Sequence, residues 1–284
     1  MSDYARDVLG KGLNFAVDPR VIPKEEIISA LETTCCRLPT EVTEKMKWLK
    51  QNLGPSLRKS IHKDLKIIIH DDARLTIPYV VPLMLNDEET LKYIDGIGVH
   101  WYWDDRIPSD VLSLTKTKKK DVFLLETESC IFREGVVLGS WNRAAAYIGS
   151  IIEYLELGFG GWMDWNMALS LSGGPTYIGY ESDSPILINA TSQEFYKQPM
   201  FYAMGHFSKF VVPGSVRLNL IHNIEEKEAI KAMAFLRPDR SIAVLIFNNA
   251  TTSFTLSFQI NSLYSSALEI EPKSIYTVVC PKEQ

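Results

Sequence analysis

Hydrophobic residues gather in four short segments in the first two thirds of the chain, and none of the four alternates with polar residues. They lie at residues 65–70 (LKIIIH), 94–100 (IDGIGVH), 122–127 (VFLLET) and 157–162 (LGFGGW). A short apolar run without alternation is typical of a strand covered on both faces of a parallel sheet. Helical candidates lie between them at residues 78–93 and 139–156, with a weaker one after Pro108.

The strand candidates start roughly thirty residues apart, which is the length of one β-α unit. This rhythm predicts an α/β architecture, either a (β/α) barrel or an open doubly wound sheet. From about residue 216 the pattern changes to short strand candidates at 229–236, 242–248, 254–260 and 274–279, separated by turn residues such as Arg237-Pro-Asp-Arg. The end of the chain therefore predicts an antiparallel β-module.

Composition limits the possible functions. The chain has 284 residues, 46% of them hydrophobic, which is enough to bury a substantial core. Its net charge is −5 and no basic stripe is present, so we expect no nucleic-acid partner. The four cysteines, Cys35, Cys36, Cys130 and Cys280, lack zinc-ligand spacing with a histidine, so we expect no metal site and no cofactor.

Localisation signals in the sequence conflict. The start, MSDYARDVLGKG, has no hydrophobic signal region, and no later segment reaches the roughly 18 apolar residues of a transmembrane helix. The chain as written is therefore expected to have no transmembrane segment and to stay in the cytoplasm. Two glycosylation sequons, at Asn189 and Asn249, point the other way, because they matter only in a secreted protein.

Polar and aromatic residues follow each of the four strand candidates. Taken one at a time, such a residue is more simply a capping acid or a core histidine. Four strand ends in succession favour a site instead, because the carboxyl ends of barrel strands form the active face. The residues are Asp71 and Asp72; His100, Trp101 and Tyr102; Glu126 and Glu128; Asp164, Trp165 and Asn166.

These residue types indicate carbohydrate chemistry. Carboxylates stand among tryptophans and tyrosines, and the sequence contains no nucleophile elbow, P-loop or dinucleotide fingerprint. Aromatic faces stack on sugar C–H surfaces, and a pair of carboxylates can act as nucleophile and acid/base in glycoside hydrolysis. Glu128 is the candidate nucleophile because it lies at the mouth, whereas Glu126 points the same way but lies deeper and is expected to be structural.

Eight motifs run in order from about Leu49 to the C-terminus: Asp71-Asp-Ala-Arg-Leu, Gly98-Val-His-Trp-Tyr, Glu128-Ser-Cys, Gly139-Ser-Trp, Gly161-Trp-Met-Asp-Trp-Asn-Met-Ala-Leu, Gly173-Gly-Pro, Asp183-Ser-Pro-Ile and Tyr196-Lys-Gln-Pro-Met-Phe-Tyr-Ala-Met-Gly-His-Phe-Ser-Lys-Phe. Together they strongly resemble the animal lysosomal glucosylceramidases of glycoside hydrolase family 30. The resemblance implies the C-terminal half of a (β/α)8 TIM barrel at residues 46–212, with a small β excursion at about 172–194 and a last barrel helix at 195–210. It also implies a β-sandwich module at 213–284.

The resemblance further implies a retaining β-glucosidase that cleaves glucosylceramide to glucose and ceramide, with Glu128 as nucleophile. His100 and Tyr102 would position the nucleophile. The glucose pocket would be lined by Asp71, Trp101, Trp165 and Asn166. Family enzymes work in the lysosome, at an anionic membrane surface and with a saposin-type activator, so these are the implied location and partners.

The sequence departs from the family in its first part. The family acid/base glutamate lies in an Asn-Glu-Pro motif at the end of the fourth barrel strand, and this chain contains no Asn-Glu-Pro. Residues 1–45 form an extension outside the family pattern. Within it Leu9-Gly-Lys-Gly-Leu-Asn-Phe-Ala, Pro19-Arg-Val-Ile-Pro and the acidic, helix-like residues 24–34 resemble a segment found beside reverse transcriptases in arthropod retroelements. Two interpretations therefore stay open: a glucosylceramidase-type hydrolase, or a catalytically inactive chimeric fragment with at most weak sugar or lipid binding.

Overall fold

The computed structural model describes residues 40–117, 121–132, 134–176, 179–221, 229–257, 259–260, 263–264 and 267–281. The chain divides into two compact units. The first comprises Met1–Ser129 and Tyr154–Trp165, and the second comprises Cys130–Glu153 and Asn166–Gln284. Most of the predicted N-terminal extension, including its retroelement-like segment, lies outside the described residues.

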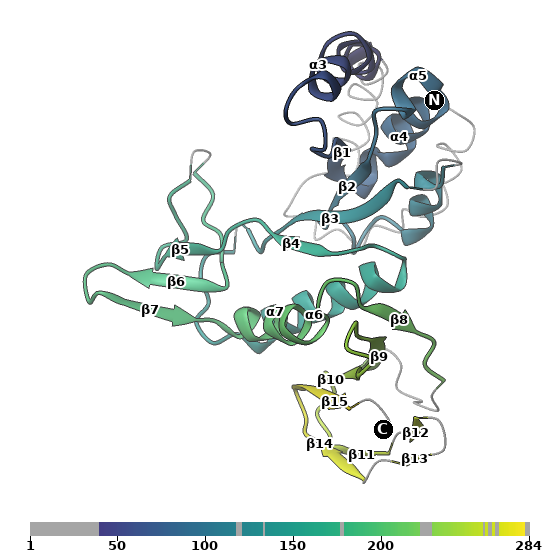
Figure 1. Ribbon diagram of the computed structural model, residues 1–284. Helices are drawn as coiled ribbons and strands as arrows, with labels where there is room; N and C mark the ends of the chain where they lie inside the picture. Colours follow the sequence, from purple (N-terminus) through teal and green to yellow (C-terminus); the bar gives the residue numbers. More distant parts are fainter. Residues whose placement is uncertain are drawn as a thin grey trace. The chain divides into compact units, whose positions relative to one another are not determined.

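A four-stranded parallel sheet forms the centre of the first unit. Its strands are β1 (Ile68–Ala73), β2 (Gly96–His100), β3 (Phe123–Ser129) and β4 (Trp162–Asp164), and they lie side by side in that order (Figure 1). The parallel α/β arrangement predicted from the unalternating apolar runs is therefore confirmed. All four strands point the same way, so their carboxyl ends share one edge of the sheet.

Short helices precede β1 and connect β1 to β2 and β2 to β3. Helical residues 40–48 lead into η1 (Leu49–Leu53) and α3 (Gly54–Lys59), and η2 (Arg74–Thr76) follows β1. The helix predicted at 78–93 forms as α4 (Ile77–Asn86) and α5 (Glu88–Leu91), because the Asp87 carboxylate accepts a 2.9 Å hydrogen bond from the Thr90 amide and caps a new helix. The weaker candidate after Pro108 is the 3-10 helix η3 (Ser109–Thr115).

One face of the sheet packs on these helices and forms the core of the first unit. Ile69 of β1 and Ile97 and Val99 of β2 are buried there, together with Ile77 and Val81 of α4. These strand residues alternate with residues of the other face, as the two-residue period of a strand requires. The helices therefore cover one side of the sheet.

The fourth strand prediction is wrong for most of its length. Residues 157–161 form a turn that reaches β4 only at Trp162, and Gly158 takes a φ of 91°, which favours glycine. Phe159 in this turn is buried, and its ring meets the ring of Tyr154 edge-on at 4.7 Å between centroids. The run is apolar because this turn packs into the core.

The second unit begins with the predicted long helix, α6 (Trp141–Glu156), whose last turn counts with the first unit. A three-stranded sheet follows, made of β5 (Ala168–Ser170), β6 (Ile186–Asn189) and β7 (Glu194–Lys197), at the place of the predicted excursion. The helix predicted at 195–210 starts later, as α7 (Pro199–Phe210). Residues 195–197 pair with β6 instead, and Pro199, which has no amide hydrogen, opens the helix.

An antiparallel β-module completes the second unit and confirms the prediction for the end of the chain. Its main sheet has the order β15 (Ser274–Cys280), β10 (Ile242–Asn248), β9 (Ile230–Leu236), β8 (Val216–Leu218). Two strand pairs accompany it, β11 (Phe254–Leu256) with β14 (Leu268–Ile270) and β12 (Gln259–Ile260) with β13 (Leu263–Tyr264). The predicted strand at 254–260 is thus divided between β11 and β12. Ala234, Val244, Ile246 and Ile270 form the core between these layers.

Candidate active site

The candidate site lies at the carboxyl ends of β1, β2 and β3. Val99 pairs with Glu126, but the next residue, His100, pairs with Glu128, so Thr127 is skipped. This bulge brings Glu128 level with His100 on the neighbouring strand. A β-bulge commonly serves to re-aim a side chain in this way.

A second bulge places Asp71 in β1. His70 pairs with Gly98 and Asp72 with Val99, so Asp71 is the skipped residue. His70 and Asp71 have φ angles of 71° and 52°, a left-handed conformation that is unusual for residues other than glycine. Such strain is held by its surroundings and clusters at functional sites.

The His70 side chain fixes this bulge, a role that the sequence did not reveal. Its Nδ1 lies 2.8 Å from the carbonyl oxygen of Gly98, which can only accept, so Nδ1 carries the proton. Its Nε2 lies 3.0 Å from the hydroxyl of Thr76. Burial lowers the pKa of His70, so the neutral ring is favoured in the folded protein.

His100 stands between the two carboxylates that the bulges place. Its Nε2 is 3.2 Å from Oδ1 of Asp71, and its Nδ1 is 4.0 Å from Oε1 of Glu128. The Tyr102 hydroxyl donates a 2.9 Å hydrogen bond to the same Oε1. Glu128 exposes 31% of its side chain and Asp71 63%, so both carboxylates are open to a ligand. The structure therefore brings together four of the predicted site residues.

Glu126 has a different environment from Glu128. It is fully buried, and its Oε1 accepts hydrogen bonds from the Ser129 hydroxyl at 2.6 Å and from the Glu128 amide at 3.2 Å. Its Oε2 accepts from the Met163 amide of β4 at 3.1 Å. Burial raises the pKa of Glu126 to about 8, although these three donors oppose the rise. Glu126 therefore ties β3 to β4 and cannot meet a substrate.

A buried cluster supports the loop after β2. Arg74 forms a 2.8 Å ion pair with Asp104, and its guanidinium lies 4.8 Å from the centre of the Tyr154 ring. The Tyr154 hydroxyl donates to the carbonyl oxygen of His100 at 3.4 Å, and burial raises the pKa of this tyrosine. The cluster was not predicted. Arg74 belongs to one of the motifs, but only the fold shows that it is buried beside Asp104.

Trp101, Trp165 and Asn166 are the remaining predicted site residues. The Trp101 amide donates to the Glu128 carbonyl at 3.2 Å, and its ring meets Trp162 edge-on at 6.1 Å between centroids. Trp165 is 43% exposed, and its amide donates to the Ser129 carbonyl at 2.8 Å. Asn166 belongs to the second unit, whereas the other predicted site residues belong to the first, so its role at the site stays a prediction.

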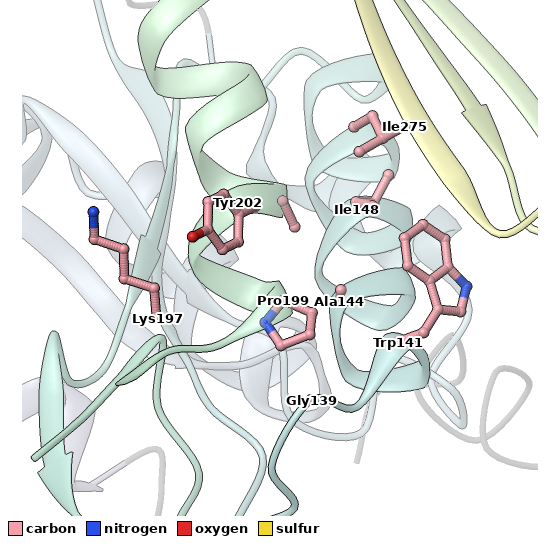
Figure 2. Close-up of a pocket in the computed structure, with 9 residues that line it drawn as sticks. Gly139, Trp141, Ala144, Ile148, Lys197, Pro199, Tyr202 and Ile275 are labelled. Atoms are coloured by element: carbon pink, nitrogen blue, oxygen red, sulfur yellow. The ribbon is translucent and has the colours of Figure 1, made fainter. Parts of the chain in front are cut away.

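The second unit contains a separate apolar cleft of about 330 Å³ between α6, α7 and β15 (Figure 2). Figure 2 shows Trp141 and Tyr202 on opposite sides of it. The cleft has no carboxylate, so it lacks the groups for glycoside hydrolysis. Its lining residues are Gly139, Trp141, Ala144, Ile148, Lys197, Pro199, Tyr202, Ala203 and Ile275.

Within the described residues, no cluster of histidine, cysteine, aspartate and glutamate side chains could hold a metal ion. Across the same ranges, no helix combines the length and the apolar character needed to cross a bilayer.

Comparison with known proteins identifies the class of protein to which this fold and candidate site belong. Residues 15–211 match the family model described as "Glycosyl hydrolase family 30 TIM-barrel domain", and residues 214–278 match "Glycosyl hydrolase family 30 beta sandwich domain". The chain belongs to glycoside hydrolase family 30. The first match begins inside the predicted extension, so the boundary at residue 46 stays a prediction.

Curated relatives and solved structures agree with this assignment. The chain is 39% identical over 215 residues to mouse "Lysosomal acid glucosylceramidase", covering 74% of this chain and 41% of that protein. It is 39% identical over 248 residues to Caenorhabditis elegans "Putative glucosylceramidase 4", covering 84% of this chain and 47% of that protein. The structure of SrfJ from Salmonella typhimurium superposes with a TM-score of 0.75 at 23% identity, over 85% of this chain and 53% of that one, and supports the fold. The chain spans about half the length of the curated relatives it matches.

Proposed function

We propose that this chain is a retaining glycoside hydrolase of the glucosylceramidase type, with Glu128 as its nucleophile. The observation that carries the proposal is the position of Glu128. Glu128 is the last residue but one of β3, lies at the carboxyl edge of the sheet and is partly exposed. The Tyr102 hydroxyl donates a 2.9 Å hydrogen bond to it, and the chain belongs to family 30. The proposed substrate, glucosylceramide, rests on the likeness to the mouse enzyme.

The proposed reaction has two steps. First, a carboxylate oxygen of Glu128 attacks the anomeric carbon, the glycosidic C–O bond breaks, and the leaving oxygen takes the bond's electron pair and a proton from the acid/base carboxyl group that this mechanism requires. A water molecule then attacks the same carbon, gives a proton back to that group, and frees the Glu128 carboxylate. Tyr102 binds Oε1, so Oε2 is the oxygen we expect to attack. Two inversions retain the β configuration.

We also propose a glucose pocket in the first unit, formed by Asp71, Trp101 and Trp165. Asp71 is exposed and anchored beside His100, so it can accept hydrogen bonds from sugar hydroxyls, and bonds to a carboxylate are stronger than neutral ones. Trp165 is exposed and can offer an aromatic face to the sugar. His100 and Tyr102 would act as positioning residues for Glu128.

The described residues place no second carboxyl group directly beside Glu128, and this supports a second candidate function. A retaining enzyme needs a second carboxyl group about 5 Å from the nucleophile. Asp71 is separated from Glu128 by the His100 ring, Glu126 is buried, and the sequence contains no Asn-Glu-Pro motif. The second candidate is therefore a catalytically inactive chimeric fragment with at most weak sugar or lipid binding.

Location and partners follow from the family resemblance alone. We propose a place in lysosomal sphingolipid breakdown, at an anionic membrane surface and with a saposin-type activator. The support is the name and identity of the mouse relative. Colocalisation of the full chain with a lysosomal marker tests the location, and a cytoplasmic distribution would contradict it.

Covalent labelling tests the nucleophile. A 2-fluoro-β-glucoside with a good leaving group needs no proton donor, so it reports on Glu128 alone. We expect one adduct per chain by intact mass on the unaltered protein and on the control Glu89→Gln, whose side chain is 71% exposed on α5. Glu128→Gln should take no label, and labelling that persists in this variant contradicts the assignment.

External azide distinguishes the two candidate functions. General acid–base catalysis contributes roughly 10²- to 10⁴-fold, so without a base the glycosyl-enzyme should hydrolyse slowly. Azide is already an anion and attacks without losing a proton. Faster turnover of an activated aryl β-glucoside with azide, yielding β-glucosyl azide, shows that the nucleophile works and the base is missing. No adduct on folded protein indicates the inactive fragment.

A further inference from the structure

The apolar cleft of the second unit is formed by α6, α7 and β15, and the proposed hydrolase reaction gives it no role. Its most deeply buried lining residues are Ala144, Ile148 and Ala203, each at most 1% exposed. The volume of about 330 Å³ lies within the range of roughly 300–1,000 Å³ that is typical of ligand sites. All lining residues belong to the second unit, so the cleft is defined within one compact part of the chain.

Two aromatic side chains stand on opposite sides of the cleft, Trp141 of α6 and Tyr202 of α7 (Figure 2). Trp141 is held in place before any ligand binds. Its indole N–H donates a 3.0 Å hydrogen bond to Oδ1 of Asn249, and the centre of its ring lies 6.2 Å from that of Phe247. A wall that is fixed in this way loses little side-chain freedom on binding, which favours affinity.

One end of the cleft is positive. Among the described residues that line it, Lys197 alone is charged, and Figure 2 shows it at the opposite end from Trp141 and Ile275. The Lys197 ammonium lies 4.9 Å from the centre of the Phe201 ring, and no carboxylate of the described residues forms an ion pair with it. Helix α7 begins at Pro199, also in the lining, and has no acidic residue in its first turn, so the positive end of its dipole adds to the field. An anionic group is therefore complementary to this end.

The lining offers few hydrogen bonds to a ligand. The Trp141 indole N–H already binds Asn249, which leaves the Tyr202 hydroxyl and the Lys197 ammonium as the polar side-chain groups. Burying the hydroxyls of a sugar without partners costs free energy, so a carbohydrate matches this cleft poorly. An alkyl chain needs no such partners and gains free energy when it leaves water.

We propose that this cleft binds one free fatty acid, with its alkyl chain between Trp141 and Tyr202 and its carboxylate beside Lys197. The volume has room for a single chain, so a phospholipid with two acyl chains does not fit. The cleft and Glu128 belong to different units. The fatty-acid site goes beyond the proposed hydrolase function, and each proposal can fail without the other.

Calorimetric titration of the full chain with decanoate and with decanol tests the class of ligand. The two probes share one alkyl chain and differ in the head group, and both are used as monomers near pH 7, where the carboxylate is ionised. We expect one decanoate per chain, and binding of decanol that is severalfold weaker.

Lys197→Met keeps most of the alkyl stem and removes the charge. Because an exposed ion pair contributes modestly, decanoate should bind about two- to fivefold more weakly, whereas decanol should bind as before. Lys209→Met is the matched control. Lys209 of α7 likewise lies beside a phenylalanine ring, 5.4 Å from the centre of Phe210, but does not line the cleft, so both affinities should stay unchanged.

Tyr202→Ala removes one aromatic wall and should weaken both probes severalfold, because less apolar surface leaves water on binding. Tyr202 is 57% exposed, so this variant is expected to fold. Tyr196→Ala is the control. Tyr196 is 38% exposed and precedes Lys197 in β7, so the two side chains point to opposite faces of the strand.

A decanoate analogue that carries a diazirine on its chain locates the site. On irradiation it should attach to residues 139–148 or 199–203, which contain the lining of α6 and α7. An excess of unlabelled decanoate should suppress this attachment.

The proposal is overturned if the folded chain does not bind decanoate, if decanol binds equally well, or if the probe attaches outside the cleft. Equal loss of both affinities in Lys197→Met, or full affinity in Tyr202→Ala, also contradicts it. Binding only to vesicles of anionic two-chain phospholipid overturns it as well, because a free fatty acid is then not the ligand.

Discussion

The Tyr102 hydroxyl donates a 2.9 Å hydrogen bond to Oε1 of Glu128, and the two side chains come from neighbouring strand ends. Glu128 reaches this position because the bulge in β3 skips Thr127 and aligns the carboxylate with His100. The hydrogen bond holds one carboxylate oxygen and leaves the other without this partner. In the proposed reaction, the backbone of β3 and the side chain of Tyr102 would together define the direction of attack.

Tyr102→Phe should therefore slow labelling of Glu128 without unfolding the protein. A hydrogen bond to a charged group contributes about 1.5–3 kcal/mol, so a loss of about tenfold or more in the labelling rate is expected. The measurement is the rate of adduct formation with the 2-fluoro-β-glucoside. The control is Tyr93→Phe, which lies three residues before Gly96, the first residue of β2, and so at the opposite end of that strand. An unchanged rate in Tyr102→Phe would show that this bond does not orient the carboxylate.

Glu126 should make the first unit less stable as pH rises. Its pKa is about 8 in the folded state against 4.5 when unperturbed, so the folded state holds the proton more tightly. The stabilising contribution is then complete below pH 4.5 and is lost as pH rises through about 8. Each unit of pKa corresponds to about 1.4 kcal/mol, which gives a total effect of several kcal/mol at most.

Glu126→Gln tests this titration. The amide cannot ionise, so the fall in the free energy of unfolding between pH 4.5 and 8 should become shallower. It also loses an acceptor for the Met163 amide, so the variant should be less stable at low pH. Denaturant unfolding at a series of pH values measures both effects. A slope as steep as that of the unaltered chain would assign the titration to another group.

The order of elements was predictable because apolar runs, turns and helical spacing are local features of the sequence. The runs at 65–70, 94–100 and 122–127 became β1, β2 and β3 with shifts of a few residues. The run at 157–162 failed because a buried turn also requires apolar residues, as Phe159 shows. The periodicity of a short run cannot distinguish these two causes of burial.

The candidate site was predictable in its residue types but not in its geometry. Strand ends indicated Asp71, His100 and Glu128, because parallel strands share one carboxyl edge. The bulges that skip Asp71 and Thr127 leave no mark on the apolar pattern, and the left-handed backbone of His70 is not signalled by glycine. Such features depend on contacts between strands, which appear only when the sheet is formed.

The Arg74–Asp104 ion pair should be essential for folding of the first unit. Arg74 is 1% exposed, and Asp104 lies 2.8 Å from its Nε. Asp104→Asn leaves a buried cation without its counter-ion, which typically costs about 3–5 kcal/mol. Denaturant unfolding should show this loss, whereas Asp105→Asn, at a side chain that is 78% exposed, should change stability little.

The double variant Arg74→Met, Asp104→Asn separates charge burial from lost packing. Methionine removes the unpaired cation, so part of the stability lost in Asp104→Asn should return. If the double variant is less stable than Asp104→Asn, the guanidinium stabilises the unit mainly through its contact with the Tyr154 ring, 4.8 Å away.

In the second unit, acid should weaken the contact between α7 and β15. His206 of α7 lies 2.8 Å from the Thr277 hydroxyl of β15, and burial lowers its pKa below 6.5. The unfolded chain therefore takes up the proton more readily, so stability is lost as pH falls below 6.5. His206→Gln keeps a polar partner for Thr277 but cannot be protonated, so its midpoint of unfolding should fall less in acid. His62→Gln, at an exposed position, is the control, and equal acid sensitivity of His206→Gln and the unaltered chain would show that another group responds to pH.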